Sequence, residues 1–355
     1  MKESIQAAVA LLQQLIATPS HSRDEGAAAD LLQRHLEEQG IAVERLHNNL
    51  IARSAAFDAA KPTLLLNSHL DTVRPVASYT RNPYAPTIEG DRLYGLGAND
   101  AGASLVALIA TFIDHYRKEL PYNLLLGISA EEECSGEQGL RSWIDRVGKI
   151  DMAIVGEPTS MQAAIAERGL VVLDCVAHGR SGHAARGEGV NALYIALDDI
   201  QTLRTLRPER CSKTLGELHL TTTMIHCGTQ HNVVPDRCEF VVDIRTTDAY
   251  TNEETVELIR SVVRSEVTPR STRIRASVID EEHPLVRAAV AAGASTFLSP
   301  TTSDRTLMAL PALKIGPGES SRSHTADEFV RLTEIEQGIE TYAQILKNLS
   351  TQYGY

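Results

Sequence analysis

Apolar side chains recur at helical spacing in two stretches near the start of the chain. The apolar positions of the first stretch are Ile5, Val9, Leu12 and Ile16. This spacing predicts a helix, which Pro19 ends because proline cannot continue one. A second helix is expected over residues 24–39, with Gly40 as its stop. Two short strands are expected next, near residues 42–46 and 50–54.

Three runs of consecutive apolar residues predict buried β-strands further along the chain. The runs cover residues 63–67, 123–128 and 152–155, and helices are expected between them at 105–112 and 137–147. Strands that are apolar on both faces and alternate with helices are typical of a parallel sheet that is covered on both sides. This part of the chain therefore predicts an α/β domain with a largely parallel sheet flanked by helices.

The pattern changes near Ala166, where strands with some two-residue alternation replace the continuous apolar runs. Strands are expected at 171–176, 218–225 and 240–244, and helices at about 190–206 and 253–264. This order predicts a smaller α+β insert that ends near Val278. Since the chain has 355 residues and roughly 150 residues per domain is usual, we expect two domains. They are an α/β domain of residues 1–166 and 279–355, and an insert of residues 167–278.

The composition is that of an ordinary soluble globular protein and narrows the possible partners. Apolar residues make up 43% and charged residues 23% of the chain, and the formal net charge is −12. This acidic balance argues against a nucleic-acid or anionic-membrane partner, because either would attract a basic surface. The sequence contains no run of about 18 apolar residues that would span a membrane, and no secretion signal is expected.

The five cysteines are spread along the chain and favour free thiols. They are Cys134, Cys175, Cys211, Cys227 and Cys238. Their odd number and the lack of a Cys-x-x-Cys pair argue against a disulfide framework. We therefore expect a protein of a reducing compartment, the cytoplasm.

Acidic and imidazole side chains follow the ends of the predicted strands. These residues are His69, Asp71, Asp100, Glu131, Glu132, Glu133, Glu157 and His324. Open α/β sheets place their ligand sites at the carboxyl ends of the strands. Each residue alone has an ordinary explanation, such as a surface histidine–aspartate pair or three glutamates at the start of a solvated helix.

Together, these residues indicate bound cations. Several carboxylates at one sheet edge repel one another, and the arrangement would be costly unless a cation neutralised them. Histidine and carboxylate ligands suit zinc, with cobalt or manganese as substitutes. If five of these residues bind metal, they are too many ligands for one tetrahedral ion. Five ligands suit two ions that lie about 3.5–4 Å apart.

Five ordered sequence blocks carry a family resemblance. They are residues 68–73 (SHLDTV), 99–102 (NDAG), 130–133 (AEEE), 156–159 (GEPT) and 323–328 (SHTADE). On these blocks the chain resembles the M20 metallopeptidase family of di-zinc aminoacylases and deacetylases, over almost its whole length. The resemblance implies a zinc-exopeptidase-like catalytic domain, with residues 167–278 as an inserted lid and dimerisation domain.

The resemblance implies a role for each candidate ligand. His69 and Glu157 would bind one zinc ion, Glu133 and His324 the other, and Asp100 would bridge both. Asp71 would hydrogen-bond the far side of His69 and fix its orientation. The resemblance also implies a cis peptide bond between Asp100 and Ala101.

The general base implied by the resemblance lies in the triple glutamate. Family members usually read Asp-Glu-Glu here, and the downstream Gly136 and Gly139 place Glu131 at the aspartate position. Glu132 would then be the base that takes a proton from the attacking water and delivers it to the leaving amine. Glu133 would be the metal ligand of this block.

Two blocks of the insert resemble the family's lid. In residues 178–185, His183 would reach the active site of a neighbouring subunit and stabilise the tetrahedral oxyanion, although a strand-end loop residue is the simpler interpretation. In residues 230–236, Asn232 would contact substrate across a homodimer. Arg245 is a candidate for the substrate α-carboxylate, because a guanidinium grips a carboxylate with two hydrogen bonds; a structural salt bridge is the alternative.

The implied substrate is a small N-acyl-L-amino acid. Residues 316–328 look closest to the acetylornithine deacetylase branch, which serves arginine biosynthesis, and the short chain resembles the subgroup that handles N-succinyl-ornithine. A succinyl carboxylate would need a nearby positive charge, and Arg305 and Arg322 are the candidates. The alternative is that both are ordinary surface arginines. The alternatives are a metallo-dipeptidase or carboxypeptidase, a succinyl-diaminopimelate desuccinylase, and a non-catalytic metal-binding protein, which the presence of Glu132 disfavours.

Overall fold

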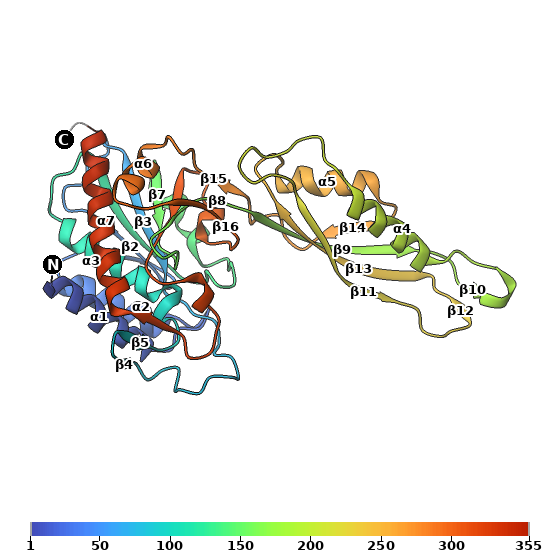
Figure 1. Cartoon of the computed structure of the whole chain (residues 1–355), viewed down its shortest axis with the longest axis horizontal. Coiled ribbons are helices and arrows are strands. Elements are labelled where there is room, and N and C mark those ends of the chain that lie inside the picture. Colours follow the sequence, from blue (N-terminus) through green and yellow to red (C-terminus); the bar gives the residue numbers. More distant parts are fainter. Residues whose placement is uncertain (1, 354–355) are drawn as a thin grey trace. The chain divides into compact units, whose positions relative to one another are not determined.

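A computed structural model describes residues 2–353 of the chain, which divides into two compact units (Figure 1). Unit 1 contains the residues before Ala166, together with Ile279–Leu298 and the residues from Ser303 onward. Unit 2 contains Ala166–Val278 and Ser299–Thr302. Unit 2 is thus an insertion in the sequence of unit 1, and its main segment begins and ends close to the change of pattern described above.

Unit 1 is built on a mixed β-sheet whose centre is parallel. Its central strands, in spatial order, are β6 (Asn123–Ser129), β3 (Thr63–His69), β7 (Met152–Val155) and β17 (Ala312–Lys314), each parallel to the next. Antiparallel strands extend the sheet: β2 (Asn49–Arg53) and β1 (Glu44–Leu46) on one side, and β8 (Ala163–Glu167) on the other. Strands β15 (Ser277–Val278) and β16 (Thr296–Ser299) pair with β8. The predicted α/β class with a largely parallel sheet is confirmed.

Long helices cover one face of this sheet. They are α1 (Lys2–Ile16), α2 (Gly26–Glu38), α3 (Ala103–His115), α6 (Pro284–Ala291) and α7 (Leu332–Gln352). Leu64 and Leu66 of β3 lie in the core that these helices form, where both are buried. Helix α3 contacts α1, α7 and β3, which explains why ten of its thirteen residues are buried and eight of these ten are apolar.

The opposite face carries short 3-10 segments in place of the helix expected over residues 137–147. The segments that replace it are η2 (Leu140–Ser142) and η3 (Ile144–Arg146), and η5 (Asp304–Leu307) is a further 3-10 segment from the C-terminal part of the chain. Trp143 packs there against Leu65 of β3. The helix prediction was wrong because Gly139 has a ψ of −148°, outside the helical region. A Cβ on Gly139 would lie 2.5 Å from the carbonyl oxygen of Ala130, so this segment follows the end of β6 closely.

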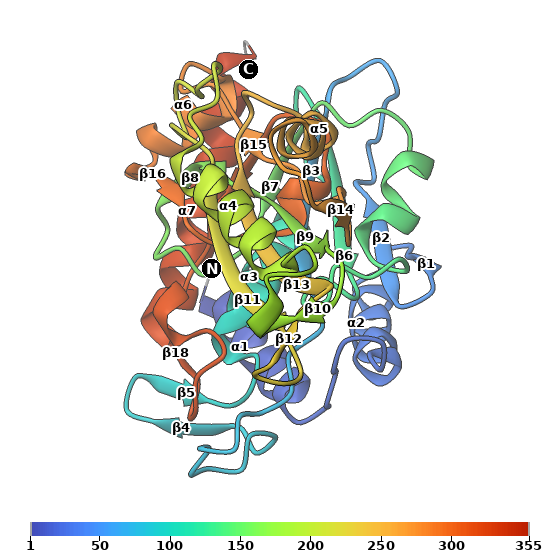
Figure 2. The ribbon, with the colours of Figure 1, turned by 90° about the vertical axis from the view of Figure 1, so that its right-hand side faces the viewer.

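A small antiparallel sheet joins two distant parts of unit 1. Its strands are β4 (Thr87–Glu89), β5 (Arg92–Tyr94) and β18 (Phe329–Arg331), seen at the lower left of Figure 2. This pairing brings Glu328 beside Gly97, although 231 positions separate them in the sequence.

Unit 2 contains a four-stranded antiparallel sheet and two helices. The strands, in spatial order, are β11 (His219–Cys227), β13 (Arg237–Thr246), β9 (Gly169–His178) and β14 (Glu266–Pro269). Helices α4 (Ala192–Thr205) and α5 (Asn252–Val262) share a core with alternate residues of β9, such as Val171 and Leu173. This is the two-residue period predicted for the insert. A separate pair of strands, β10 (Gly182–His183) and β12 (Val233–Val234), lies at the narrow end of unit 2 in Figure 1.

All five cysteines are free thiols, as expected from their number and spacing. Cys134 and Cys211 are exposed, whereas Cys175 and Cys238 are buried. Within residues 2–353, no helix combines the length and the apolar character needed to cross a bilayer.

Candidate metal centre

The carboxyl ends of neighbouring parallel strands bring the candidate ligands together in unit 1. His69 ends β3, Glu131–Glu133 follow β6, and Glu157 follows β7. Asp100 lies in the turn η1 (Ala98–Gly102) before α3, and its peptide bond to Ala101 is cis, as the resemblance implied. His324 lies in the loop before β18 and adds a ligand from the C-terminal part of the chain.

His69 is oriented so that one ring nitrogen faces acidic side chains. Its Nδ1 donates a hydrogen bond to the backbone carbonyl oxygen of Asp71 at 2.9 Å, so Nε2 carries the lone pair of the neutral ring. Nε2 is buried and has no hydrogen-bond partner among the described residues. It lies 3.4 Å from Oδ1 of Asp100 and 3.8 Å from Oε1 of Glu157. A buried lone pair that faces two carboxylates is an arrangement that a cation would satisfy.

The second histidine lies on the other side of Asp100. Nε2 of His324 lies 2.9 Å and 3.1 Å from the two carboxylate oxygens of Glu133 and 3.7 Å from Oδ2 of Asp100. Asp100 therefore directs Oδ1 toward His69 and Oδ2 toward His324. A carboxylate placed in this way can bridge two cations.

The crowding of acids changes the protonation of the cluster. Burial raises the pKa of Glu157 to about 8, and the charges of Asp100 and Glu133 act in the same direction. Burial also raises the pKa of Glu132 well above its ordinary value. The hydrogen bond to Glu133 raises the pKa of His324 to about 9. The cluster thus favours positive charge and resists additional negative charge, which is the electrostatic character of a cation site.

Two groups of side chains are spaced as metal ligands. One group is His69, Glu132 and Glu157, and the other is His69, Asp100 and Glu133. In each group the ligand atoms lie within 4.8 Å of one another. Imidazole nitrogen and carboxylate oxygen are donors that zinc, cobalt and manganese accept. The side chains present therefore fit a centre of divalent cations, and the first group includes the residue expected to act as general base.

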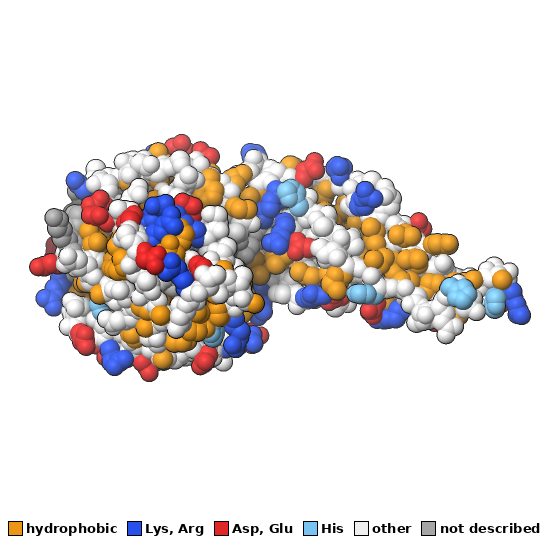
Figure 3. Space-filling model, turned by 60° about the horizontal axis from the view of Figure 1, so that its bottom comes forward, with side chains coloured by type: hydrophobic (Ala, Val, Ile, Leu, Met, Phe, Trp, Pro, Cys, Tyr) orange, Lys and Arg blue, Asp and Glu red, His pale blue; other side chains and the backbone are white. Residues whose placement is uncertain are grey.

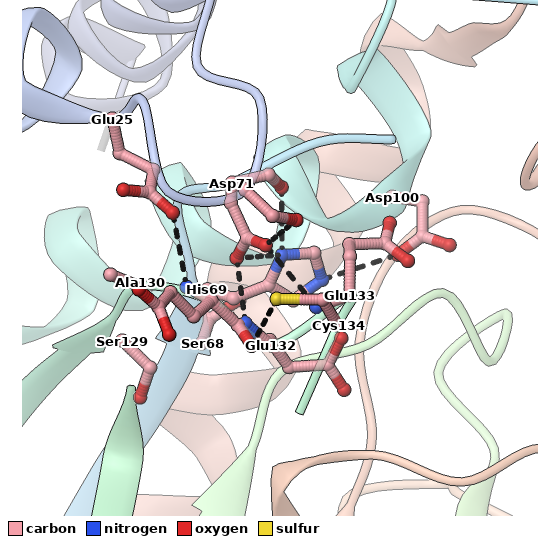
Figure 4. A network of polar contacts seen from close by, with 12 residues as sticks. Glu25, Ser68, His69, Asp71, Asp100, Ser129, Ala130, Glu132, Glu133 and Cys134 are labelled. Atoms are coloured by element: carbon pink, nitrogen blue, oxygen red, sulfur yellow. Dashed lines mark hydrogen bonds and ion pairs between the residues drawn. The ribbon is translucent and has the colours of Figure 1, made fainter. Parts of the chain in front are cut away.

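The glutamate turn is held by two acids that lie outside it (Figure 4). Asp71 accepts hydrogen bonds from the backbone N–H groups of Glu132 at 3.0 Å and Glu133 at 3.2 Å. Glu25, which is fully buried, accepts one from the N–H of Glu131 at 3.2 Å. Three consecutive N–H groups are thus bonded to carboxylates, and this fixes the path of the turn beside the strand end that carries His69.

Asp71 meets His69 through a different atom from the one expected. The hydrogen bond from His69 is accepted by the Asp71 backbone oxygen, whereas Oδ1 of Asp71 lies 3.5 Å from Nδ1. The carboxylate also accepts a hydrogen bond from Oγ of Ser22 at 2.7 Å. Burial alone would raise the pKa of Asp71, but the contact with His69 and these hydrogen bonds lower it. Asp71 therefore stays an ionised acceptor that serves mainly the glutamate turn.

The side chain of Glu131 is used inside its own turn. Its Oε2 accepts a hydrogen bond from the N–H of Gln138 at 3.2 Å. The side chain also fills the space that a Cβ on Gly136 would need. Glu132 and Glu133 thus join the cluster of potential ligands, while Glu131 does not.

Two buried acids near the cluster had been given no role from the sequence. Glu328, 2% exposed, accepts hydrogen bonds from the turn that carries Asp100. Asp304, 3% exposed, lies in η5, and burial raises its pKa to about 7. Its charge in turn contributes to the raised pKa of Glu132. Glu328 lies in one of the five sequence blocks but had no assigned role, and Asp304 lies outside these blocks.

The structure corrects the expectations for Arg305 and Arg322. Arg305 is fully buried and donates hydrogen bonds to two backbone carbonyl oxygens of β8, at 2.6 Å each. Arg322 forms ion pairs with Glu334 at 2.7 Å and Glu319 at 2.6 Å. Neither is a surface arginine, and both guanidinium groups are engaged in holding the fold. Their position gives no support to a role in binding a succinyl carboxylate.

The two expected lid residues lie together in unit 2. His183 is opposite Val233 in the β10–β12 pair, and the carbonyl oxygen of Asn232 accepts a hydrogen bond from the N–H of Ala184 at 3.1 Å. Nδ1 of His183 accepts the N–H of Ala185 at 3.2 Å. Nε2 therefore carries the proton of the neutral ring and remains a hydrogen-bond donor.

Arg245 lies at the other end of β13 from the strand pair that contains His183. Its guanidinium forms an ion pair with Asp243 at 2.9 Å, and both side chains are partly exposed. The structural salt bridge considered from the sequence is therefore present.

The matched family spans most of the chain. Residues 65–348 match peptidase family M20/M25/M40, and all candidate ligands fall within them. A Proteus mirabilis protein named acetylornithine deacetylase is 27% identical over 374 residues, which cover 96% of each chain. A Paracoccus denitrificans protein named succinyl-diaminopimelate desuccinylase is 31% identical over 270 residues, which cover 71% of this chain and 70% of that protein.

Solved structures share the fold of the whole chain. A tripeptidase from Staphylococcus aureus has a TM-score of 0.78 at 20% identity, covering 98% of this chain and 99% of that one. A Bacillus subtilis protein described as a dinuclear metal-binding peptidase of the M20 family has a TM-score of 0.76 at 16% identity, covering 99% of each chain. At these identities the likeness concerns the fold alone.

Proposed function

The chain belongs to peptidase family M20/M25/M40 and is a metal-dependent amidohydrolase, and from this premise we propose that it removes the acyl group from the α-nitrogen of a small L-amino acid. The observation that carries the proposal is the placement of Asp100 between His69 and His324, with one carboxylate oxygen toward each. Two relatives carry the names of a deacetylase and a desuccinylase, both of which describe removal of an acyl group.

We assign two zinc ions to this centre, with cobalt or manganese as substitutes. His69 and Glu157 would hold one ion, Glu133 and His324 the other, and Asp100 both. When bound, such a pair polarises a carbonyl group and lowers the pKa of water. The unpartnered Nε2 of His69 and the bifurcated contact between His324 and Glu133 support this assignment.

Glu132 is the proposed general base. Its backbone N–H is fixed by Asp71, and its carboxylate lies within 4.8 Å of the ligand atoms of His69 and Glu157. From there it takes a proton from the attacking water and passes that proton to the leaving nitrogen as the amide bond breaks. The products are a carboxylic acid and a free amino acid.

Within this class, we propose N-acetyl- or N-succinyl-L-ornithine as the substrate, which would place the enzyme in arginine biosynthesis. The Proteus mirabilis relative, whose name contains this substrate, matches over nearly the full length of both chains. Arg305 and Arg322, whose guanidinium groups are engaged in the fold, give no support to the succinyl form over the acetyl form.

A hydrolysis screen tests the proposed substrate class. The zinc-loaded protein is assayed for amine release from N-acetyl-, N-succinyl- and N-formyl-ornithine, N-succinyl-diaminopimelate and a panel of dipeptides. We expect kcat/KM for an N-acyl-ornithine to exceed that for every dipeptide by at least about tenfold, which corresponds to about 1.4 kcal/mol of transition-state binding. Faster hydrolysis of dipeptides would favour the metallo-dipeptidase or carboxypeptidase alternative, to which the tripeptidase fold is equally suited.

A homodimer formed through unit 2 is part of the proposal. Strand β11 is an edge of its sheet, and none of its residues is buried. Its Met224 and Ile225 are exposed, as are Tyr194 and Leu197 of α4, and hydrophobic side chains gather on this unit in Figure 3. An edge strand with one free side, beside exposed apolar side chains, is a surface that a second copy can cover by extending the sheet.

The dimer would allow His183 to stabilise the oxyanion and Asn232 to contact substrate in the partner's site. For Arg245 to bind the substrate α-carboxylate, its partly exposed ion pair with Asp243 would have to open. Sedimentation velocity on the whole chain and on Met224→Glu tests this arrangement. We expect a dimer that the substitution converts to an inactive monomer. A concentration-independent monomer with full activity would contradict both the dimer and the roles of His183 and Asn232.

Free thiols support a cytoplasmic location. All five cysteines are unpaired, and two of them are exposed. Exposed thiols persist in compartments where glutathione and thioredoxin keep them reduced.

A further inference from the structure

The carboxylate of Glu328 is a buried acceptor for three backbone N–H groups. Its Oε2 accepts the N–H of Gly97 at 2.9 Å, and its Oε1 accepts those of Asn99 at 2.8 Å and Asp100 at 2.9 Å. Glu328 is only 2% exposed. Buried backbone N–H groups need a hydrogen-bond partner, and three of them find theirs in this one carboxylate, which therefore defines the path of the turn that carries Asp100.

The same segment holds the turn at a second point. The side chain of Asn99 accepts the N–H of Glu319 at 2.9 Å and donates to the Glu319 carbonyl oxygen at 3.0 Å. Gly318 passes so close that a Cβ there would lie 2.5 Å from Oδ1 of Asn99. Residues near the start and at the end of one continuous segment, residues 318–328, therefore both form hydrogen bonds with the Asp100 turn.

This segment also carries His324. Because Glu328 and Glu319 bind the Asp100 turn, the 3.7 Å separation between Oδ2 of Asp100 and Nε2 of His324 is set inside one hydrogen-bonded unit. The position of His69 does not depend on this unit, since it is set by β3 and by the backbone of Asp71. His69 is thus held by one part of the fold, and Asp100 with His324 by another.

We propose that Glu328 is a positioning residue that fixes Asp100 relative to His324 and thereby sets the affinity of the second cation site. It does not touch a cation or the substrate itself. The inference rests on the proposed cation pair and is independent of the identity of the substrate.

Replacing Glu328 by glutamine weakens its hold on the Asp100 turn, while the size of the side chain stays nearly the same. The amide offers one oxygen in place of two, and its NH₂ group would face a backbone N–H that also needs an acceptor. At least one of the three N–H groups is then left buried without a partner. The adjacent Asp327 provides a matched control, because it accepts hydrogen bonds from Thr80 and Arg81, away from the Asp100 turn.

The test is a zinc titration of the metal-stripped whole chain, in competition with a chromophoric chelator. We expect wild type to bind two zinc ions per chain, and we expect Asp327→Asn to bind both ions with the affinities of wild type. For Glu328→Gln we expect the ion held by Glu133 and His324 to bind about 10–100-fold more weakly, the range typical of residues that orient metal ligands. The ion held by His69 and Glu157 should lose less affinity, because only one of its three ligands, Asp100, lies in the unit that Glu328 holds. Cobalt absorption spectra should show the same loss of the second site.

A purely structural role would produce a different result. Thermal unfolding is measured on every variant, and a lower midpoint with both zinc affinities unchanged would overturn the proposal. If Glu328→Gln does not fold, Glu328→Asp is tested in the same way, because it keeps the charge but is too short to reach all three N–H groups. Binding of fewer than two ions by wild type would contradict the proposed metal centre itself, which separates that failure from failure of this inference.

Discussion

His69 is oriented by the backbone of Asp71, two positions along the chain: Nδ1 donates to the Asp71 carbonyl oxygen at 2.9 Å, while the carboxylate lies 3.5 Å away. The backbone contact leaves the carboxylate of Asp71 free to accept the N–H groups of Glu132 and Glu133. One residue therefore orients a ligand with its main chain and holds the glutamate turn with its side chain.

Replacing Asp71 by asparagine separates these two tasks. The backbone contact to His69 is retained, but the amide must turn an NH₂ group toward the N–H of either Glu132 or Glu133. We expect kcat to fall about 10–100-fold, while the zinc content of the purified protein stays at the wild-type level. Steady-state kinetics and metal analysis of the same sample check this. A loss of zinc in proportion to activity would show that the side chain matters mainly through His69.

The Glu132→Gln variant tests the general base. The amide keeps the size of the side chain but cannot accept a proton, so turnover should fall at least about 10²–10⁴-fold, the usual contribution of a general base. Zinc stoichiometry should be unchanged, because the five assigned ligands remain. Substantial activity in this variant would rule out the assigned role.

Removal of the metal should inactivate and destabilise the protein. Dialysis against a strong chelator takes away the charge that offsets the carboxylates around His69, and activity should return when zinc is restored. Zinc present at about 100 times its Kd should add about 2.7 kcal/mol to the free energy of unfolding. Differential scanning calorimetry with and without zinc measures this gain. An unchanged midpoint together with full activity after chelation would contradict a metal-dependent centre.

Gly139→Ala should destabilise unit 1 and disturb the catalytic turn. The new Cβ would lie 2.5 Å from the carbonyl oxygen of Ala130, the residue before the triple glutamate, so the backbone must shift. We expect a loss of about 1–3 kcal/mol in urea unfolding, with a lower kcat. Gly26→Ala is the control, because its nearest neighbour, Asn48 Oδ1, lies at 3.9 Å. Equal stability of the two variants would contradict the argument.

Thiol reactivity should separate the exposed from the buried cysteines. Burial raises the pKa of both Cys175 and Cys238 to about 12, so almost none of either is thiolate at pH 8. Cys134 and Cys211, which are exposed, should react rapidly with Ellman's reagent in the native protein. The buried pair should react only after unfolding in guanidinium. Rapid labelling of Cys175 in the folded chain, located by peptide mass mapping, would contradict the packing of unit 2.

The sequence failed at specific places, and each has a physical cause. Residues 137–147 have a helical pattern but form 3-10 segments, because Gly139 must pass close to the end of β6. Arg305 and Arg322 read as substrate or surface residues, since nothing local shows that distant carbonyl and carboxylate groups meet them. Glu328 lies in a recognised block, but nothing in the sequence showed its role, because its three partners lie more than 200 positions away.

By itself, the sequence determined the α/β class, the main strands and helices of both units, and the types of side chain available to bind cations. These features follow from local periodicity and side-chain chemistry, which short segments carry on their own. Only the tertiary structure decided that Oδ1 of Asp100 faces His69 and Oδ2 faces His324, and that buried acids hold the turns behind them. Such relationships depend on where separate loops meet, and that is set by the packing of the whole unit around its sheet.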